Sequence, residues 1–161
     1  MMQRPMFKAI LIGGLIAGAL DLLFAVSFAG YNGAAPARVF QAIASGVLGN
    51  AAFAGGGGVS ALGVACHFGL SILWAVLFAV AARQLSVLAR RPVFAGLGFG
   101  VVVFLCMRLI VLPLSAYPNP VTFKPLGTAL DLLSHMLLFG MPIALLASRA
   151  IRRRTAGVDA P

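Results

Sequence analysis

Four long apolar segments dominate the hydrophobic pattern of the chain, and short polar stretches separate them. Each segment is close to or above the roughly 20 apolar residues that a helix needs to cross the hydrocarbon core of a bilayer. The segments cover residues 7–29, 59–81, 93–114 and 126–147. We therefore predict an all-α, polytopic membrane protein in which four transmembrane helices form a bundle.

The first apolar segment has two interpretations. Its basic start, its apolar run and the small residues around Ser27 and Ala29 also fit a cleaved signal peptide. The run is long for such a peptide, however, and Asp21 interrupts it. We therefore expect an uncleaved first span.

A weaker apolar pattern lies between the first two segments, in residues 38–53. Phe40, Ile43 and Val47 recur there at helical spacing. Because this stretch is rich in Ala and Gly, we predict a short amphipathic helix that lies on the membrane surface or dips into it, rather than a full span. Four glycines at 55–58 follow as a flexible hinge.

Composition supports a membrane location and argues against a soluble protein. Of the 161 residues, 61% are hydrophobic and 9% are charged, whereas a soluble domain carries about 25% charged residues. The net charge of +9 could suggest nucleic acid, but the basic residues sit at the ends of apolar segments. We therefore expect a lipid bilayer as partner and no nucleic acid. The length fits one membrane domain over 1–154, followed by a disordered tail over 155–161.

The placement of Lys and Arg predicts the orientation of the chain. The N-terminus, the second loop and the C-terminus hold nine basic residues, whereas the other two loops hold only Arg38 and Lys124. Basic loops face the cytoplasm, so we predict that both termini are cytoplasmic. The nine residues are Arg4, Lys8, Arg83, Arg90, Arg91, Arg149, Arg152, Arg153 and Arg154.

Five titratable side chains lie inside the predicted spans: Asp21, His67, Arg108, Asp131 and His135. At the helical rise per residue, all five fall about 7 to 14 Å from the outer ends of their spans. Asp131 and His135 are four residues apart and therefore share a helix face. Since ionisable groups inside a membrane normally turn away from lipid, we predict one buried polar layer in the periplasmic half of the bundle.

Glycine pairs predict where the helices approach each other. Gly14 and Gly18 in the first segment, and Gly96 and Gly100 in the third, each form a GxxxG pair of the kind that packs helices closely. Asp21 follows the first pair on the same side of the helix and belongs to a packed face. Arg108 is rotated away from the second pair, so it either pairs inside the bundle or snorkels to the outer interface.

Three functions are open for the polar layer. In our working interpretation Arg108 pairs with Asp21 or Asp131 and the histidines bond a carboxylate or a carbonyl, as a structural network in a protein of unknown molecular activity. Alternatively, Asp21 and Asp131 carry protons or a cation in a transporter or channel subunit, with a homo-oligomer or a larger membrane complex forming the path. In the third hypothesis His67 and His135 ligate one b-type haem.

The sequence contains no recognisable catalytic or metal-binding motif. Neither GxSxG nor HExxH occurs, and Ser134 beside His135 needs a partner from elsewhere to form a dyad. Cys66 and Cys106 lack metal-ligand spacing, and we interpret them as small buried hydrophobes, with a disulfide between them left open. We therefore expect a non-enzymatic protein with no catalytic residues, no bound metal and, unless the haem hypothesis holds, no cofactor.

Several stretches resemble a family of small, four-span bacterial inner-membrane proteins with no assigned function. The stretches are FKAILIGGLIAGALDLLFAVSF, QAIASGVLGNAAF, ALGVACHFGLSILWAVLFA, LIVLPLSA and LDLLSHMLLFGMPIALL. The resemblance covers nearly the whole chain and implies a multi-pass protein of the bacterial inner (plasma) membrane. It implies no activity or substrate, and Arg108 departs from the pattern of the group.

Overall fold

The structure is a computed structural model, and it describes residues 4–158. Over these residues the chain is helical throughout, without strands, which confirms the predicted all-α class. In chain order the elements are α1 (Arg4–Tyr31), α2 (Pro36–Leu48), the 3-10 helix η1 (Gly49–Ala54), α3 (Gly57–Gln84), α4 (Ser86–Arg90), α5 (Pro92–Cys106), the π-helix η2 (Met107–Val111), α6 (Leu112–Leu114), α7 (Pro125–Ser134), the π-helix η3 (His135–Gly140) and α8 (Met141–Val158).

Four helices of the described chain are long and apolar enough to cross a membrane, and each contains one of the predicted segments. They are Pro5–Tyr31, Gly57–Gln84, Pro92–Leu114 and Pro125–Arg152. The third joins α5, η2 and α6, and the fourth joins α7, η3 and the first part of α8. Pro92 and Pro125 open these two helices at the first turn, where the missing N–H of proline costs nothing.

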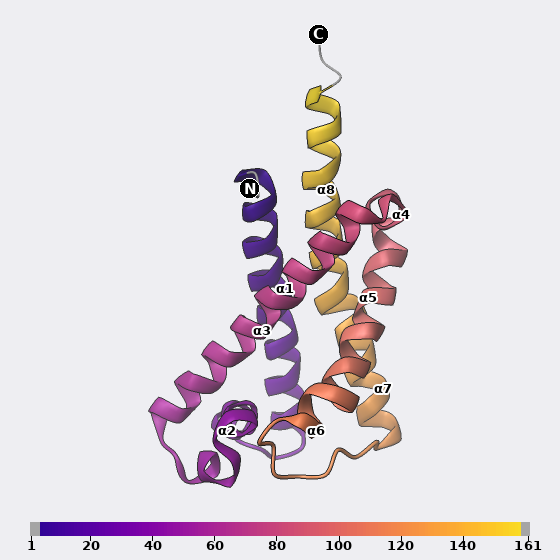
Figure 1. Ribbon diagram of the computed structural model, residues 1–161. Coiled ribbons are helices and arrows are strands. Elements are labelled where there is room, and N and C mark those ends of the chain that lie inside the picture. The colour runs from indigo at the N-terminus through magenta and orange to yellow at the C-terminus, as the bar shows by residue number, and fades with distance from the viewer. Residues whose placement is uncertain (1–3, 159–161) are drawn as a thin grey trace.

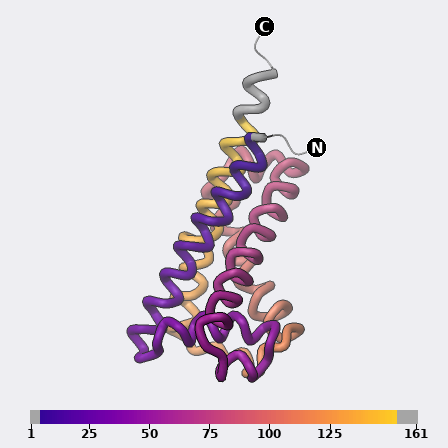
Figure 2. The backbone as a smooth tube through the Cα atoms, turned by 90° about the vertical axis from the view of Figure 1, so that its left-hand side faces the viewer, coloured from indigo at the N-terminus to yellow at the C-terminus, as the bar shows by residue number. Residues whose placement is uncertain are grey.

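The four long helices run up and down, so that the start of α1 and the end of α8 lie at the same end of the bundle (Figure 1). We call this end, which also holds α4, the basic end, because Lys8, Arg83, Arg90 and Arg149 are exposed there. The opposite end holds α2, η1 and the loop 115–124, and we call it the capped end. α1 packs against both α3 and α8, as Figure 2 shows from the side.

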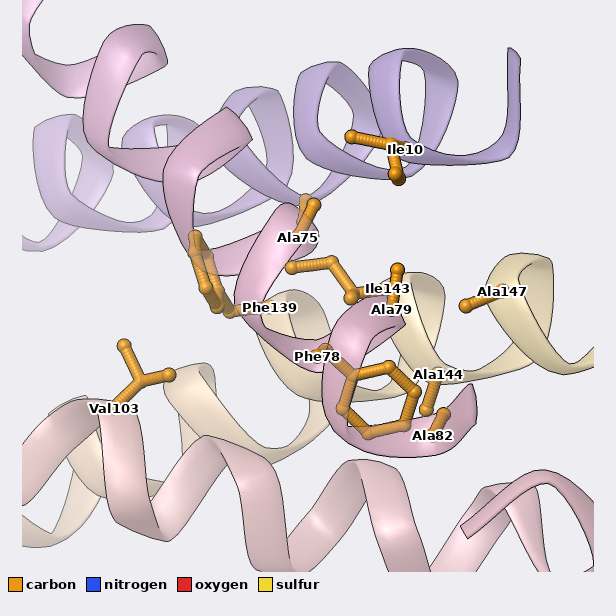
Figure 3. Packing of buried hydrophobic residues seen from close by; sticks show 11 residues of the cluster. Ile10, Ala75, Phe78, Ala79, Ala82, Val103, Phe139, Ile143, Ala144 and Ala147 are labelled. Carbon is orange, nitrogen blue, oxygen red and sulfur yellow. The ribbon is translucent and has the colours of Figure 1, made fainter. Parts of the chain in front are cut away.

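The hydrophobic core lies in the half of the bundle towards the basic end, and Figure 3 shows how its side chains pack between the helices. Its buried side chains come from α1, α3, α5, η3 and α8, and alanine is the most frequent among them. They are Ile10, Ala17, Ala75, Phe78, Ala79, Ala82, Val103, Phe139, Ile143, Ala144 and Ala147. Small side chains let the helix backbones come close, so the contacts in this half are dense.

The predicted amphipathic helix is found, but as two pieces. α2 ends at Leu48, and η1 continues to Ala54. Gly49 separates them with a φ of 61°, a left-handed conformation that glycine adopts without strain. The α2 helix lies close against α3 because Gly63 has no side chain. The carbonyl group of Phe40 occupies the space that a Cβ atom at Gly63 would need.

The last helix is longer than expected. We predicted that the fourth apolar segment ends at 147 and that a disordered tail covers 155–161, but α8 continues to Val158. Ala and Arg are frequent in this stretch and are good helix formers, so the helix has a local reason to continue past the apolar segment. Residues 159–161 of the predicted tail lie outside the described residues.

The glycines of α5 give a matched pair of substitutions. A Cβ atom at Gly100 would lie 2.5 Å from the Cα atom of Met136, whereas one at Gly98 meets nothing within 4 Å. We expect Gly100→Ala to lower the free energy of unfolding by about 1–3 kcal/mol, because the α5–η3 backbones must separate. Gly98→Ala should leave it unchanged or raise it by a few tenths, because alanine is the better helix former. Thermal unfolding in mild detergent, followed by circular dichroism, measures the difference, and equal midpoints would contradict the close crossing.

Candidate functional site

A salt bridge between η2 and α7 lies at the centre of the polar residues. Nη2 of Arg108 lies 2.8 Å from Oδ2 of Asp131, and Nε donates to the same oxygen at 3.2 Å. Nη1 donates to the carbonyl oxygen of Thr122 in the loop 115–124, at 2.8 Å. The rings of Phe104 and Phe123 lie beside the guanidinium, with centroids 5.2 and 5.4 Å from its carbon. Of the two positions expected for Arg108, the structure therefore shows the paired one.

His135 connects this salt bridge to α1. Its Nδ1 atom lies 2.9 Å from the carbonyl oxygen of Asp131 and 3.2 Å from Oδ1 of the same residue. The same nitrogen is 3.8 Å from Oδ1 of Asp21, which also accepts a 2.8 Å hydrogen bond from the hydroxyl group of Ser134. Because Nδ1 faces three oxygen atoms, it carries the ring proton. Asp21, Arg108, Asp131 and His135 thus form one network, which we call the charged network.

His67 lies apart from the charged network, at the crossing of α1 and α3. Its Nε2 atom is 2.9 Å from the carbonyl oxygen of Gly18, and one turn later Ser71 donates to the carbonyl oxygen of Gly14 at 2.6 Å. The predicted glycine pair of α1 makes both bonds possible, because the bare backbone lets α3 approach its carbonyl groups.

Arg108 and His135, the two basic residues of the charged network, both lie in π-helical segments. Arg108 belongs to η2, which is followed by an i to i−5 hydrogen bond from the N–H of Leu112 to the carbonyl of Met107. His135 opens η3, and the N–H group after that segment also donates five residues back. π turns are rare in proteins, but those that occur are often found at functional sites. They advance the chain by more residues per turn, so the side chains point in directions that an ideal α-helix does not give.

A proline follows each π segment after one residue, and it explains the wider turn. Pro113 follows η2 and Pro142 follows η3. In an α-helix the proline ring collides with the carbonyl group four residues earlier, which here belongs to Leu109 and Leu138. Both leucines lie inside the π segments, where the wider turn moves their carbonyl groups away from the ring. The sequence therefore contains a local signal for both segments.

The charged network and His67 line one cavity of about 750 Å³. The cavity lies where α3 and α5 diverge: they meet near α4 and separate towards the capped end (Figure 1). At the closed side the ring of Phe99 contacts those of Trp74 and Phe78, with centroids 6.1 and 4.9 Å apart. Residues of α2 and of the loop 115–124 line the other side.

Two contacts join the elements that cover the cavity. The N–H group of Ala116 donates to the carbonyl oxygen of Gly46 at 2.9 Å, which ties the loop 115–124 to α2. Gln41 donates from Nε2 to the carbonyl oxygen of Gly55 at 2.6 Å, which ties α2 to the chain before α3. We call α2 and the loop 115–124 the cover of the cavity, and hydrogen bonds hold it on both of its sides.

Within the described part of the chain, no group of three or more His, Cys, Asp or Glu side chains could hold a metal ion. Cys66 lines the cavity, and both Cys66 and Cys106 are free thiols, so the disulfide left open by the sequence is not formed.

Some functional contacts were missed from the sequence. Ser134 was considered only as a nucleophile, but it is the hydrogen-bond donor to Asp21. Phe104 lies four residues before Arg108, a spacing that places both on one helix face and could have indicated their contact. Gly140 lacked a glycine partner at GxxxG spacing, yet it packs against Gly96 and Gly100 of α5.

Arg108 tests whether the salt bridge stabilises the fold. Arg108→Leu should lower the free energy of unfolding by about 1–3 kcal/mol, because it leaves the Asp131 carboxylate without its cation; the pair is partly exposed, at 21% and 31%, which reduces the effect. The double variant Arg108→Leu/Asp131→Leu should regain most of the loss, since it removes both charges. Arg83→Leu, at an exposed site of the basic end, is the matched control. Equal losses in the single and double variants would contradict the pairing.

The haem hypothesis can be checked by absorption. Nε2 of His67 is held by Gly18 and Nδ1 of His135 by Asp131, so ligation through Nε2 of His67 would break a contact between α1 and α3. A haem ligated through that nitrogen of His67 would therefore require α1 and α3 to rearrange. We expect a featureless visible spectrum for protein purified from cells that make haem. A sharp Soret band that is lost in His67→Ala and in His135→Ala would establish the haem site instead.

Comparisons of the chain with protein-family models, with curated proteins and with solved structures give no match. The resemblance to small four-span bacterial inner-membrane proteins therefore stays a prediction. The charged network and the cavity are the features of the structure that bear on its function.

Proposed function

We propose that this chain is a non-enzymatic, multi-pass protein of the bacterial inner membrane, with both termini in the cytoplasm. Four helices of sufficient length and apolar character support the membrane location. Large apolar side chains are exposed along all four of them, among them Leu23, Leu73, Leu105 and Leu137. Lipid would cover these side chains, and the excess of Lys and Arg at the basic end supports the orientation.

Within this proposal the charged network is a structural element that fixes the register of the helices in the periplasmic half. The observation that carries it is that the network pairs its charged groups across three separate stretches of the chain. Arg108 bonds Asp131, His135 reaches both carboxylates, and Ser134 closes the link to Asp21. In a membrane an unpaired charge is costly, so a shift of one helix against another would be opposed by the loss of these partners. The network thus selects one packing.

A proton or cation pathway is the second candidate, and the cavity favours it. Asp131 is 31% exposed and Asp21 is 13% exposed, and both line the cavity. Beyond them, towards the basic end, the core is closed by buried side chains such as Val103 and Phe139. The arrangement gives the carboxylates a space on the capped side and a packed barrier on the other, as a one-sided access state requires. Transport would need the barrier to open, in a single copy or in an oligomer.

Proton flux in liposomes separates the two candidates. If the charged network is structural, a pH gradient across liposomes that contain the native protein should decay no faster than one across protein-free liposomes. A flux that the native protein supports and Asp131→Asn abolishes would replace the structural role by the transport role. The thermal midpoint of Asp131→Asn has to be measured alongside, so that a loss of flux is not a loss of fold.

A further inference from the structure

The cavity at the capped end has the size and lining of a binding site for a small molecule. Its volume of about 750 Å³ lies within the range of about 300–1,000 Å³ that is usual for such sites. Most of its wall is apolar, and its charged groups come from α1, η2 and α7, with the histidines on α3 and η3. Apolar lining residues include Leu22, Ile43, Leu70, Val111 and Val121.

The negative and positive side chains that line the cavity do not balance. Two carboxylates and one guanidinium line it, which leaves a formal charge of −1 when the histidines are neutral. Arg108 is bonded to Asp131 and to a carbonyl oxygen, so it offsets that carboxylate. Asp21 has the neutral hydroxyl of Ser134 at 2.8 Å, and His135 at 3.8 Å as its salt-bridge partner in the described chain. The excess negative charge therefore belongs to Asp21.

We propose that this cavity binds a monovalent organic cation with an apolar body, with the cationic group beside Asp21 and the body against the apolar wall. Protein atoms around the site lower the effective dielectric below that of water, which strengthens the attraction between opposite charges. The ring of Tyr117, which lines the cavity, adds an aromatic surface that attracts a cation. This inference goes beyond the structural role of the charged network and does not require transport.

An anion or a lipid chain fits the same cavity less well. An anion at Arg108 would lie beside Asp131, which already accepts two bonds from the guanidinium, and would be repelled by both carboxylates. A lipid chain would fill the apolar part but would leave the charge of Asp21 without compensation. A bound anion and a bound lipid chain are therefore the alternatives to a bound cation, and probes of opposite charge distinguish them.

The bound cation and a proton on His135 compete, because either one neutralises the charge of Asp21. Affinity for the cation should therefore rise with pH, as the positively charged imidazolium of His135 loses its second ring proton. The titratable and charged groups that face this cavity come from every side of it except α2: Asp21, Cys66, His67, Arg108, Tyr117, Asp131 and His135. Of these groups, His135 is the salt-bridge partner of Asp21, with its Nδ1 atom 3.8 Å from Oδ1 of the carboxylate.

Equilibrium dialysis with labelled tetraphenylphosphonium tests the inference on the full-length protein in mild detergent. Tetraphenylborate, which has the same shape and the opposite charge, is the matched probe. We expect the phosphonium to bind in a 1:1 ratio and the borate not to bind above the level of empty micelles. Asp21→Asn should weaken phosphonium binding by about tenfold or more, whereas Gln84→Lys, which raises the net charge by the same one unit at an exposed position of the basic end, should not weaken it. His135→Gln should remove the dependence on pH.

The cysteines provide a second measurement that does not depend on a charge variant. Cys66 lines the cavity and Cys106 does not. In the Cys106→Ala variant, tetraphenylphosphonium should slow the labelling of Cys66 by a methanethiosulfonate reagent. In the Cys66→Ala variant it should leave the labelling of Cys106 unchanged. This comparison holds even when Asp21→Asn fails to fold.

Three results would overturn the inference. Equal binding of both probes, unchanged in Asp21→Asn, would show an apolar or lipid site. Preferred binding of the borate would show that Arg108 sets the charge preference. Absence of phosphonium binding, together with unprotected Cys66, would show that the cavity holds no such ligand. None of these results depends on whether the protein transports protons.

Discussion

The contact of two bare backbones, α5 against η3, is the constraint on which the rest of this structure depends. Gly96 and Gly100 on one side and Gly140 on the other leave no room for a side chain between the helices. His135 takes its place from this crossing, because its carbonyl group packs directly against Gly100. Asp131, one turn earlier, is then held where Arg108 of the adjoining helix can reach it. The charged network is thus a consequence of helix packing as much as a cause of it.

The bundle is dense in one half and hollow in the other, and the path of α3 explains why. Near the basic end α3 packs with α1, α8 and, through the aromatic rings around Phe99, with α5. Its bonds to the backbone of α1 at Gly14 and Gly18 then keep it beside α1 as it leaves α5. The space between α3 and α5 is covered by α2, which Gly63 admits close to α3.

Much of this arrangement could be predicted from the sequence. Long apolar runs located the four helices. Counting residues from the ends of the runs placed Asp21, His67, Arg108, Asp131 and His135 in one layer, and the structure joins all of them except His67 in the charged network. The GxxxG pairs identified the crossings correctly, because the absence of a side chain is visible in a sequence. The direction of Arg108 was not predictable from ideal α-helical geometry, since η2 changes the rotation of the helix around it. Gly140 was missed because its glycine partners lie on another helix, and such partners become visible only when the helices are placed together.

The cover of the cavity has a mechanical property that follows from its connections. The loop 115–124 is bonded to α2 at one end, through Ala116 and Gly46, and to the charged network near its other end, through Thr122 and Arg108. Five residues of chain, two of them the prolines Pro118 and Pro120, join these two attachment points, and prolines stiffen such a connection. A displacement of α2 that carries Ala116 along therefore pulls on the carbonyl group that Arg108 holds. A movement of α2 that opens the cover would therefore also strain the bond between Arg108 and Thr122, and through Arg108 it would act on the salt bridge to Asp131.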